Sequence, residues 1–192
     1  MKVDELLKLS KEDLVGKVIC FPTDTVYGVG VLVNDVEGAN RIYQMKNRAE
    51  NKPLAYLASS IDDILPYIDN LPEKVRKIAT TYWPGALTIV FNKNKKQRIL
   101  INPDIPTIGF RIPHSDIALK ILKKFGVMAT TSINLSGEVP LNDYKTIKEH
   151  FGAQIDYLIE EDDEPKSNVS STVIDATKEE IIMLRQGDIK IN

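Results

Sequence analysis

Apolar runs in this chain alternate with amphipathic stretches and polar turns. The runs 18–21 and 86–91 are rich in β-branched residues, which is typical of buried strands. The same pattern predicts further strands at 31–33, 54–58, 108–112, 127–129 and 155–159. Helical spacing of apolar residues predicts helices within 6–14 and over 35–46, 61–65, 72–79, 116–124 and 142–150. Strands that alternate with helices favour an α/β fold.

Small polar residues and glycines follow two of these strands. The first strand leads into FPTDTVYGVG at 21–30, and the strand at 127–129 leads into TTSINLSG at 130–137. If the two strand ends lie side by side in one sheet, they form a polar cleft at its carboxyl edge, where open α/β sheets bind ligands. The alternative for each residue taken alone is a structural turn.

Cations and neutral hydrogen-bonding side chains lie near the same strand ends. Arg111 stands in an apolar strand, so it needs either an internal carboxylate or a bound anion. Lys46, Arg48 and Lys52 follow a helix, where they are either a solvated helix end or exposed cations of a cleft. Arg185 is a further cation, and the neutral hydrogen-bonding residues are Thr23, Ser132, Asn134 and Ser171. Because the planar guanidinium of arginine can bind phosphate or carboxylate through two hydrogen bonds, these residues together predict an anionic substrate that carries phosphates.

Composition narrows the class of protein. At 192 residues, with 43% hydrophobic and 27% charged residues, the chain is expected to form one globular domain over 1–192. It has no apolar run of membrane-spanning length, and its N-terminus lacks a secretory signal, so we expect a cytoplasmic protein. A net charge of -2 gives no overall attraction to nucleic acid. The acidic run 160–165 is expected to be a solvated loop.

Familiar catalytic motifs are missing from the sequence. One cysteine, Cys20, and two histidines exclude a disulfide framework and leave too few ligands for structural zinc. Neither a phosphate-binding G-x-x-x-x-G-K-[ST] loop nor a G-x-G-x-x-G fingerprint occurs. Trp83 is expected to pack in the core rather than to stack on a ligand. Catalysis would therefore depend on positioning reactants and neutralising charge.

Seven segments resemble, in one collinear order, the signature of the Sua5/YciO/YrdC family. They are FPTDTVYGVG, K-x-R-x-x-x-K-P-L at 46–54, WPGALTIVF, T-x-x-x-R-x-P at 107–113, TSINLSG, SSTVID and LRQG. Together they cover nearly the whole chain. The resemblance implies a YrdC-like fold, in which one open, twisted, mixed sheet with flanking helices surrounds a large concave cleft.

The resemblance also implies an activity, L-threonylcarbamoyladenylate synthase. Such an enzyme converts L-threonine, bicarbonate or CO2 and ATP to threonylcarbamoyl-AMP and pyrophosphate, the first step toward N6-threonylcarbamoyladenosine (t6A) at position 37 of tRNA. Mg2+ is expected with the phosphates of ATP, and no side chain is assigned as a metal ligand. Downstream t6A transferase proteins are the implied partners, no membrane is involved, and direct contact with tRNA is left open.

Family roles carry over to matching residues of this sequence. Lys46, Arg48, Ser132 and Asn134 resemble the K-x-R and S-x-N catalytic tetrad. L-threonine is expected at Thr23, Arg111, Thr130 and Ser171. ATP is expected at Arg48, Lys52, Thr107, Ser132 and Arg185.

Some positions depart from the longer family members and resemble the short form. Lys52 and Leu57 stand where those members carry Asn and His, and Pro140 replaces a Ser. The chain ends soon after LRQG, so a stand-alone catalytic domain is expected. Two rival functions are an RNA-binding module, which a basic cleft would suit, and a YciO-like paralogue without synthase activity. Net acidity argues against the first, and the intact K-x-R and S-x-N pairs argue against the second.

Overall fold

The structure is a computed structural model that describes residues 1–160 and 166–191. All but the first residue of the predicted acidic loop at 160–165 lies outside them. The strands are β1 (Ile19–Phe21), β2 (Gly28–Leu32), β3 (Ala55–Leu57), β4 (Leu87–Asn92), β5 (Thr107–Arg111), β6 (Met128–Ser132), β7 (Tyr157–Leu158), β8 (Thr172–Asp175) and β9 (Ile182–Arg185). The helices are α1 (Val3–Leu6), α2 (Val36–Met45), α3 (Ile61–Ile64), α4 (Glu73–Tyr82), α5 (Asp116–Phe125) and α6 (Tyr144–Phe151), with 3-10 turns η1 (Glu12–Leu14) and η2 (Leu65–Tyr67).

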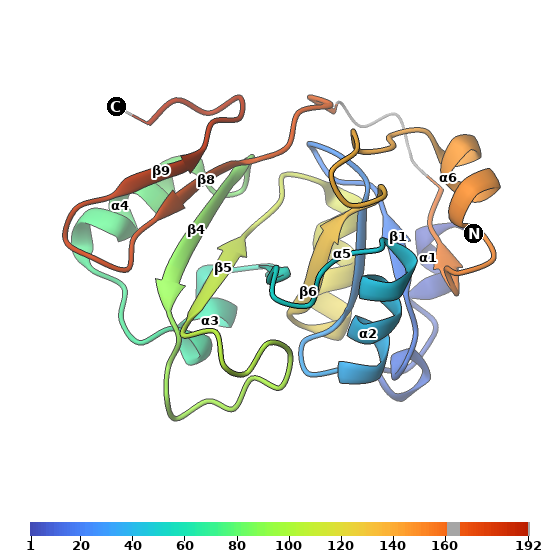
Figure 1. The fold of residues 1–192 in the computed structure, drawn as a ribbon, viewed down its shortest axis with the longest axis horizontal. Coiled ribbons are helices and arrows are strands. Elements are labelled where there is room, and N and C mark those ends of the chain that lie inside the picture. The colour runs from blue at the N-terminus through green and yellow to red at the C-terminus, as the bar shows by residue number, and fades with distance from the viewer. Residues whose placement is uncertain (161–165, 192) are drawn as a thin grey trace.

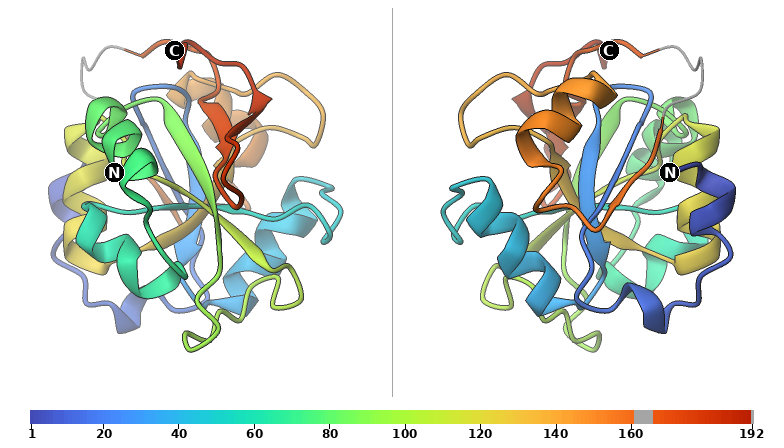
Figure 2. Two further views of the ribbon diagram at one scale, coloured as in Figure 1. Left: turned by 90° about the vertical axis from the view of Figure 1, so that its left-hand side faces the viewer. Right: turned by 90° about the vertical axis from the view of Figure 1, so that its right-hand side faces the viewer.

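One mixed sheet organises the described part of the chain (Figure 1). Its strand order is β7-β1-β2-β6-β3-β5-β4-β8-β9. The pairs β1–β7, β3–β5 and β4–β8 are parallel, and the remaining pairs are antiparallel. Helices α1 and α5 lie on one side of the sheet, and α2 and α6 lie on the other (Figure 2). The predicted open mixed sheet with flanking helices is confirmed.

Side-chain caps place the starts of three helices close to the predicted positions. Asp35 accepts a hydrogen bond from the Gly38 amide at the start of α2, and Ser115 accepts one from the Ala118 amide at the start of α5. Asp143 caps α6, the helix expected over 142–150, and accepts a hydrogen bond from the Thr146 amide. The N-terminal leucines do not form one helix as expected, because α1 ends at Leu6 and the chain turns again at η1.

The polar stretch after residue 129 is part of a strand rather than a turn. β6 continues to Ser132, and β2 begins earlier than expected, at Gly28. The two strands pair antiparallel, with Gly28 opposite Ser132 and Gly30 opposite Thr130. A methyl group on Gly30 would lie 2.6 Å from Thr130 Cγ2, so only glycine permits this close pairing.

The two faces of the sheet differ in chemistry because side chains alternate along each strand. Tyr56, Ile89, Phe110 and Ala129 point to one face and are buried in the larger apolar core. Trp83 joins this core and donates its indole N–H to the carbonyl of Leu87, so the prediction of a core position is confirmed. The residues next to them along β3, β4, β5 and β6 point to the opposite face and line a cavity: Ala55, Val90, Gly109 and Thr130.

The single cysteine also lies where the sequence predicted. Cys20 is a fully buried residue of β1. None of the helices in the described residues is long and apolar enough to cross a bilayer.

Candidate functional site

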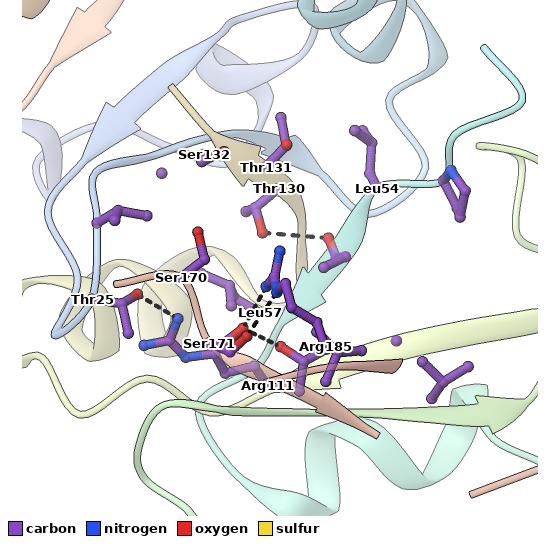
Figure 3. Close-up of a pocket in the computed structure, with 18 of the residues that line it drawn as sticks. Thr25, Leu54, Leu57, Arg111, Thr130, Thr131, Ser132, Ser170, Ser171 and Arg185 are labelled. Atoms are coloured by element: carbon purple, nitrogen blue, oxygen red, sulfur yellow. Dashed lines mark hydrogen bonds between the residues drawn. The ribbon is translucent and has the colours of Figure 1, made fainter. Parts of the chain in front are cut away.

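A cavity of about 410 Å3 occupies the polar face of the sheet (Figure 3). Hydroxyl side chains from several strands line it, and its only charged lining side chains among the described residues are arginines. These are Arg48, Arg111 and Arg185. With no carboxylate on its wall, the cavity favours an anionic ligand.

The two polar strand ends meet at this cavity, although they are not adjacent. Gly28 of β2 lies between them, opposite Phe21 of β1 on one side and opposite Ser132 of β6 on the other. The strands that lead into the two polar stretches, β1 and β6, are thus separated by β2, which belongs to the first stretch and pairs with β6. Since Gly28 has no side chain, Thr23 and Ser132 still line one continuous space.

The structure brings most of the predicted site residues together. Those that line the cavity are Thr23, Arg48, Thr107, Arg111, Thr130, Ser132, Ser171 and Arg185. Three predicted residues do not line it: Lys46, Lys52 and Asn134. Pro140, one of the departures from the longer family members, is not a lining residue either, whereas Leu57 is.

Lys46 is buried behind the cavity wall. Its side chain is 1% exposed, so the expectation of an exposed cation is wrong. The ammonium donates to the carbonyl oxygens of Ser132 and Asn134 and to Asn134 Oδ1, the last two at 2.7 and 3.1 Å. Burial, reinforced by the nearby Arg48 charge, lowers the pKa of Lys46 to about 7. Lys46 thus fixes the β6 end from behind.

The same short segment is tied by its own side chains. Ser132 Oγ donates to Asn134 Oδ1 at 2.6 Å, and Asn134 Nδ2 donates to the carbonyls of Leu135 and Glu138. Asn134 therefore shapes the turn that follows β6, and Ser132 alone of this pair reaches the cavity. The K-x-R and S-x-N motifs, far apart in sequence, form one hydrogen-bonded unit.

Arg48 lies in the loop that follows α2. Its guanidinium donates to the carbonyls of Lys52 and Pro53, at 3.2 and 3.0 Å, so it closes the loop on itself. Lys52 is exposed and is not one of the lining residues. Of the three predicted loop cations, one faces the cavity, one is buried and one is solvated.

Arg111 has an internal carboxylate as its partner, one of the two alternatives predicted for it, and it also lines the cavity. Its Nη2 lies 2.5 Å from Asp24 Oδ1, its Nη1 lies 2.7 Å from Thr25 Oγ1, and its Nε donates to the carbonyl of Gly85. The hydrogen bond to Thr25 is drawn in Figure 3. Burial lowers the pKa of Arg111, and the Asp24 carboxylate opposes that shift.

A second arginine, Arg185, is held by Ser171, the residue that precedes β8. Arg185 donates to the Ser171 carbonyl at 2.9 Å and to Ser171 Oγ at 3.2 Å, and Ser171 Oγ also shares a 2.8 Å hydrogen bond with Thr88. Thr88 was not predicted from the sequence, and neither were three other lining residues: Thr25, Thr131 and Ser170. The signal for Thr88 was a hydroxyl inside the apolar run at 86–91.

A metal site made by side chains has no support in the described residues. No group of three His, Cys, Asp or Glu side chains gathers there in a way that could hold an ion. Any divalent cation would need its ligands mainly from a bound molecule.

A family model for Sua5, YciO and YrdC proteins, described as "telomere recombination", matches residues 14–187. The chain belongs to the Sua5/YciO/YrdC family. Among curated family members, the threonylcarbamoyl-AMP synthase of Pyrococcus abyssi is 32% identical over 177 residues, which are 92% of this chain and 52% of that protein. The putative synthase of Methanocaldococcus jannaschii is 31% identical and covers 99% of this chain and 88% of its own length.

Solved structures agree with this membership. The crystal structure of P. abyssi Sua5 complexed with L-threonine has a TM-score of 0.86 at 31% identity and covers 96% of this chain and 54% of that one. E. coli YciO shares the fold, with a TM-score of 0.83 at 23% identity over 97% of this chain and 89% of that one. This chain thus spans about half the length of the P. abyssi protein.

Proposed function

We propose that the chain is an L-threonylcarbamoyladenylate synthase, a nucleotidyltransferase that makes threonylcarbamoyl-AMP and pyrophosphate from L-threonine, bicarbonate or CO2 and ATP. The observation that carries the proposal is a cavity whose only charged lining side chains, in the described chain, are three arginines set among hydroxyls. Relatives at 29 to 32% identity bear the synthase name, which supports this reading over a YciO-like one.

Two sets of lining residues suit the two substrates. In the proposal, L-threonine lies against Thr23, Arg111, Thr130 and Ser171, where one arginine fork meets a carboxylate. ATP lies along Arg48, Thr107, Ser132 and Arg185, with exposed Lys52 reaching the phosphates from the loop. Mg2+ would be held by the phosphates of ATP, whose negative charge it reduces.

The chemistry has two steps. The deprotonated amine of threonine forms a C–N bond with the carbon of CO2, a proton goes to solvent, and a carbamate results. A carbamate oxygen then attacks the α-phosphorus of ATP, the bond from that phosphorus to the bridging oxygen breaks, and pyrophosphate leaves with the electron pair. The residues on the wall hold the reactants together and offset the charge that develops.

The four residues of the K-x-R and S-x-N tetrad have two different roles in this proposal. Ser132 and Arg48 face the reactants, whereas Lys46 and Asn134 hold Ser132 in place from behind. The product is an activated threonylcarbamoyl group, so a t6A transferase protein must consume it on tRNA, and no contact between this chain and tRNA is needed. A cytoplasmic location is part of the proposal.

Pyrophosphate release by the purified protein tests the function. We expect release with ATP, L-threonine and bicarbonate together, and none when any one of the three is omitted. ATP cleavage that is indifferent to threonine would overturn the proposal. A protein that binds threonine but releases no pyrophosphate would instead support the YciO-like reading.

A further inference from the structure

The only charged partner of Arg111 in the described chain is a carboxylate that does not line the cavity. Asp24 pairs with Arg111 at 2.5 Å, and the two side chains are 13% and 7% exposed. The backbone amide of His114 also donates to Asp24 Oδ1 at 3.0 Å, so this carboxylate is fixed from both sides. Asp24 is not itself a lining residue, although its chain neighbours Thr23 and Thr25 are.

This pairing gives the cavity an uneven charge. Among the described residues, Arg48 and Arg185 donate to neutral carbonyl and hydroxyl groups and pair with no carboxylate, so no described carboxylate offsets their positive charge on the wall. Arg111 and Asp24 together carry no net charge. Buried charges interact strongly over several ångströms, so a ligand at Arg111 also experiences Asp24.

Three hydrogen bonds within the protein leave part of the Arg111 fork available. A guanidinium has five N–H donors, and Asp24, Thr25 and Gly85 accept from three different nitrogens. The remaining N–H groups can meet one carboxylate. A second negative charge in the ligand would then lie close to the Asp24 carboxylate and be repelled by it. A positive charge beside the ligand's own carboxylate would instead be attracted to Asp24.

We propose that Asp24 is a specificity-determining residue that makes the Arg111 end of the cavity select a zwitterionic amino acid over a simple carboxylate. The inference rests on the proposed placement of L-threonine at Arg111. A carboxylate without an ammonium group gains the Arg111 contact but is repelled by Asp24. An amino acid makes the same contact with Arg111, and its ammonium group is also attracted to Asp24. Repulsion of the simple carboxylate by Asp24 therefore supplies much of the selectivity.

The matched probe is (R)-3-hydroxybutyrate, which is L-threonine without its amine. We expect wild-type protein to bind L-threonine at least tenfold more tightly than this probe in calorimetric titrations. D24N should lower that ratio about tenfold, by weakening threonine binding and strengthening probe binding. D24E keeps the charge and should stay within threefold of the wild-type ratio.

A purely structural role for Asp24 predicts a different result. Asp156 makes a comparable ion pair with Arg41, at 2.6 Å, away from the cavity lining. D156N should lower the unfolding temperature and leave the ligand ratio unchanged. A folded D24N with the wild-type ratio would overturn the inference while leaving the synthase proposal intact.

Wild-type protein alone also decides the matter if D24N does not fold. Equal affinity for L-threonine and (R)-3-hydroxybutyrate would overturn the inference. Wild-type protein that binds neither compound would contradict the placement of threonine, and with it the proposed function, before any variant is made.

Discussion

Lys46 Nζ lies 2.7 Å from the carbonyl oxygen of Asn134, a residue 88 positions further along the chain. This contact joins the end of α2 to the turn after β6. It explains how a lysine that never reaches the cavity can still control Ser132, which does. Four predictions concern the cavity and its supports, and one concerns the charge on this lysine.

Replacing Lys46 with methionine should disable the enzyme through Ser132. K46M keeps the apolar stem but leaves buried carbonyl oxygens without a donor, at about 1–3 kcal/mol each. We expect pyrophosphate release to fall at least tenfold and the free energy of unfolding to drop. Chemical denaturation and the release assay measure both. The control K120M, on the exposed face of α5, should change neither pyrophosphate release nor the free energy of unfolding. Full activity of K46M would contradict the proposed role of Lys46 in holding Ser132.

The lowered pKa of Lys46 makes stability depend on pH. Between the folded value near 7 and the unfolded value near 10.5, the unfolded chain binds more protons, so stability rises with pH. The slope approaches about 1.4 kcal/mol per pH unit for one proton. Denaturation of wild type and K46M from pH 7 to 9.5 should show a growing difference in favour of wild type. A constant difference would mean that the acceptor oxygens keep the ammonium charged.

Substitution by alanine should have different effects at the two β2 glycines, Gly28 and Gly30. In G30A the new methyl would lie 2.6 Å from Thr130 Cγ2, so we expect a loss of about 1–3 kcal/mol in the free energy of unfolding. In G28A no atom lies closer than 3.9 Å, so stability should change little. Because Gly28 lines the cavity, G28A should instead weaken substrate binding. Similar stabilities for the two variants would refute this contrast.

Arg48 should matter for activity and hardly for folding. Its hydrogen bonds to the carbonyls of Lys52 and Pro53 stay within its own loop, so R48A should unfold within about 1 kcal/mol of wild type. Pyrophosphate release should be lost, and R48K should restore little, because an ammonium cannot replace a planar fork. Retained activity in R48A would remove this residue from the site.

Thr88 should contribute to binding through its hydroxyl alone. T88V keeps the shape and the strand propensity but removes the 2.8 Å hydrogen bond to Ser171. A lost hydrogen bond of this kind costs about 0.5–1.5 kcal/mol. We therefore expect the KM for L-threonine to rise between twofold and tenfold with the KM for ATP unchanged. T80V, at an exposed site on α4, is the control; an equal effect on both substrates would argue for general damage.

Much of the fold follows from local sequence signals. Apolar runs predicted the strands from β1 to β7 but not β8 or β9, and the helix expected from 116 begins there, after its cap Ser115. β6 was cut short in the prediction because its polar end, Thr130 to Ser132, has the composition of a turn. Pairing with β2, and with β3 at Thr130, keeps that end extended, and a local pattern does not contain such pairing.

The site was harder to predict than the fold. Arg111 was expected to need a partner because a buried charge is costly. Its partner, Asp24, is 87 residues away, and no local sequence pattern identifies it. Lys46 resembled a solvated helix end because its acceptors lie 86 and 88 residues further on. Thr88 escaped notice because threonine is also a common strand residue.

The cavity collects residues from Thr23 near the start of the chain to Arg185 near its end. No fragment shorter than 23–185 contains all of the described lining residues, so a ligand binds only when nearly the entire sheet has assembled. Such a ligand stabilises the folded state by mass action, by about 2.7 kcal/mol at one hundred times its dissociation constant. Substrate supply would therefore protect the chain from proteolysis, and loss of its last ten residues, which removes Arg185, would forfeit that protection.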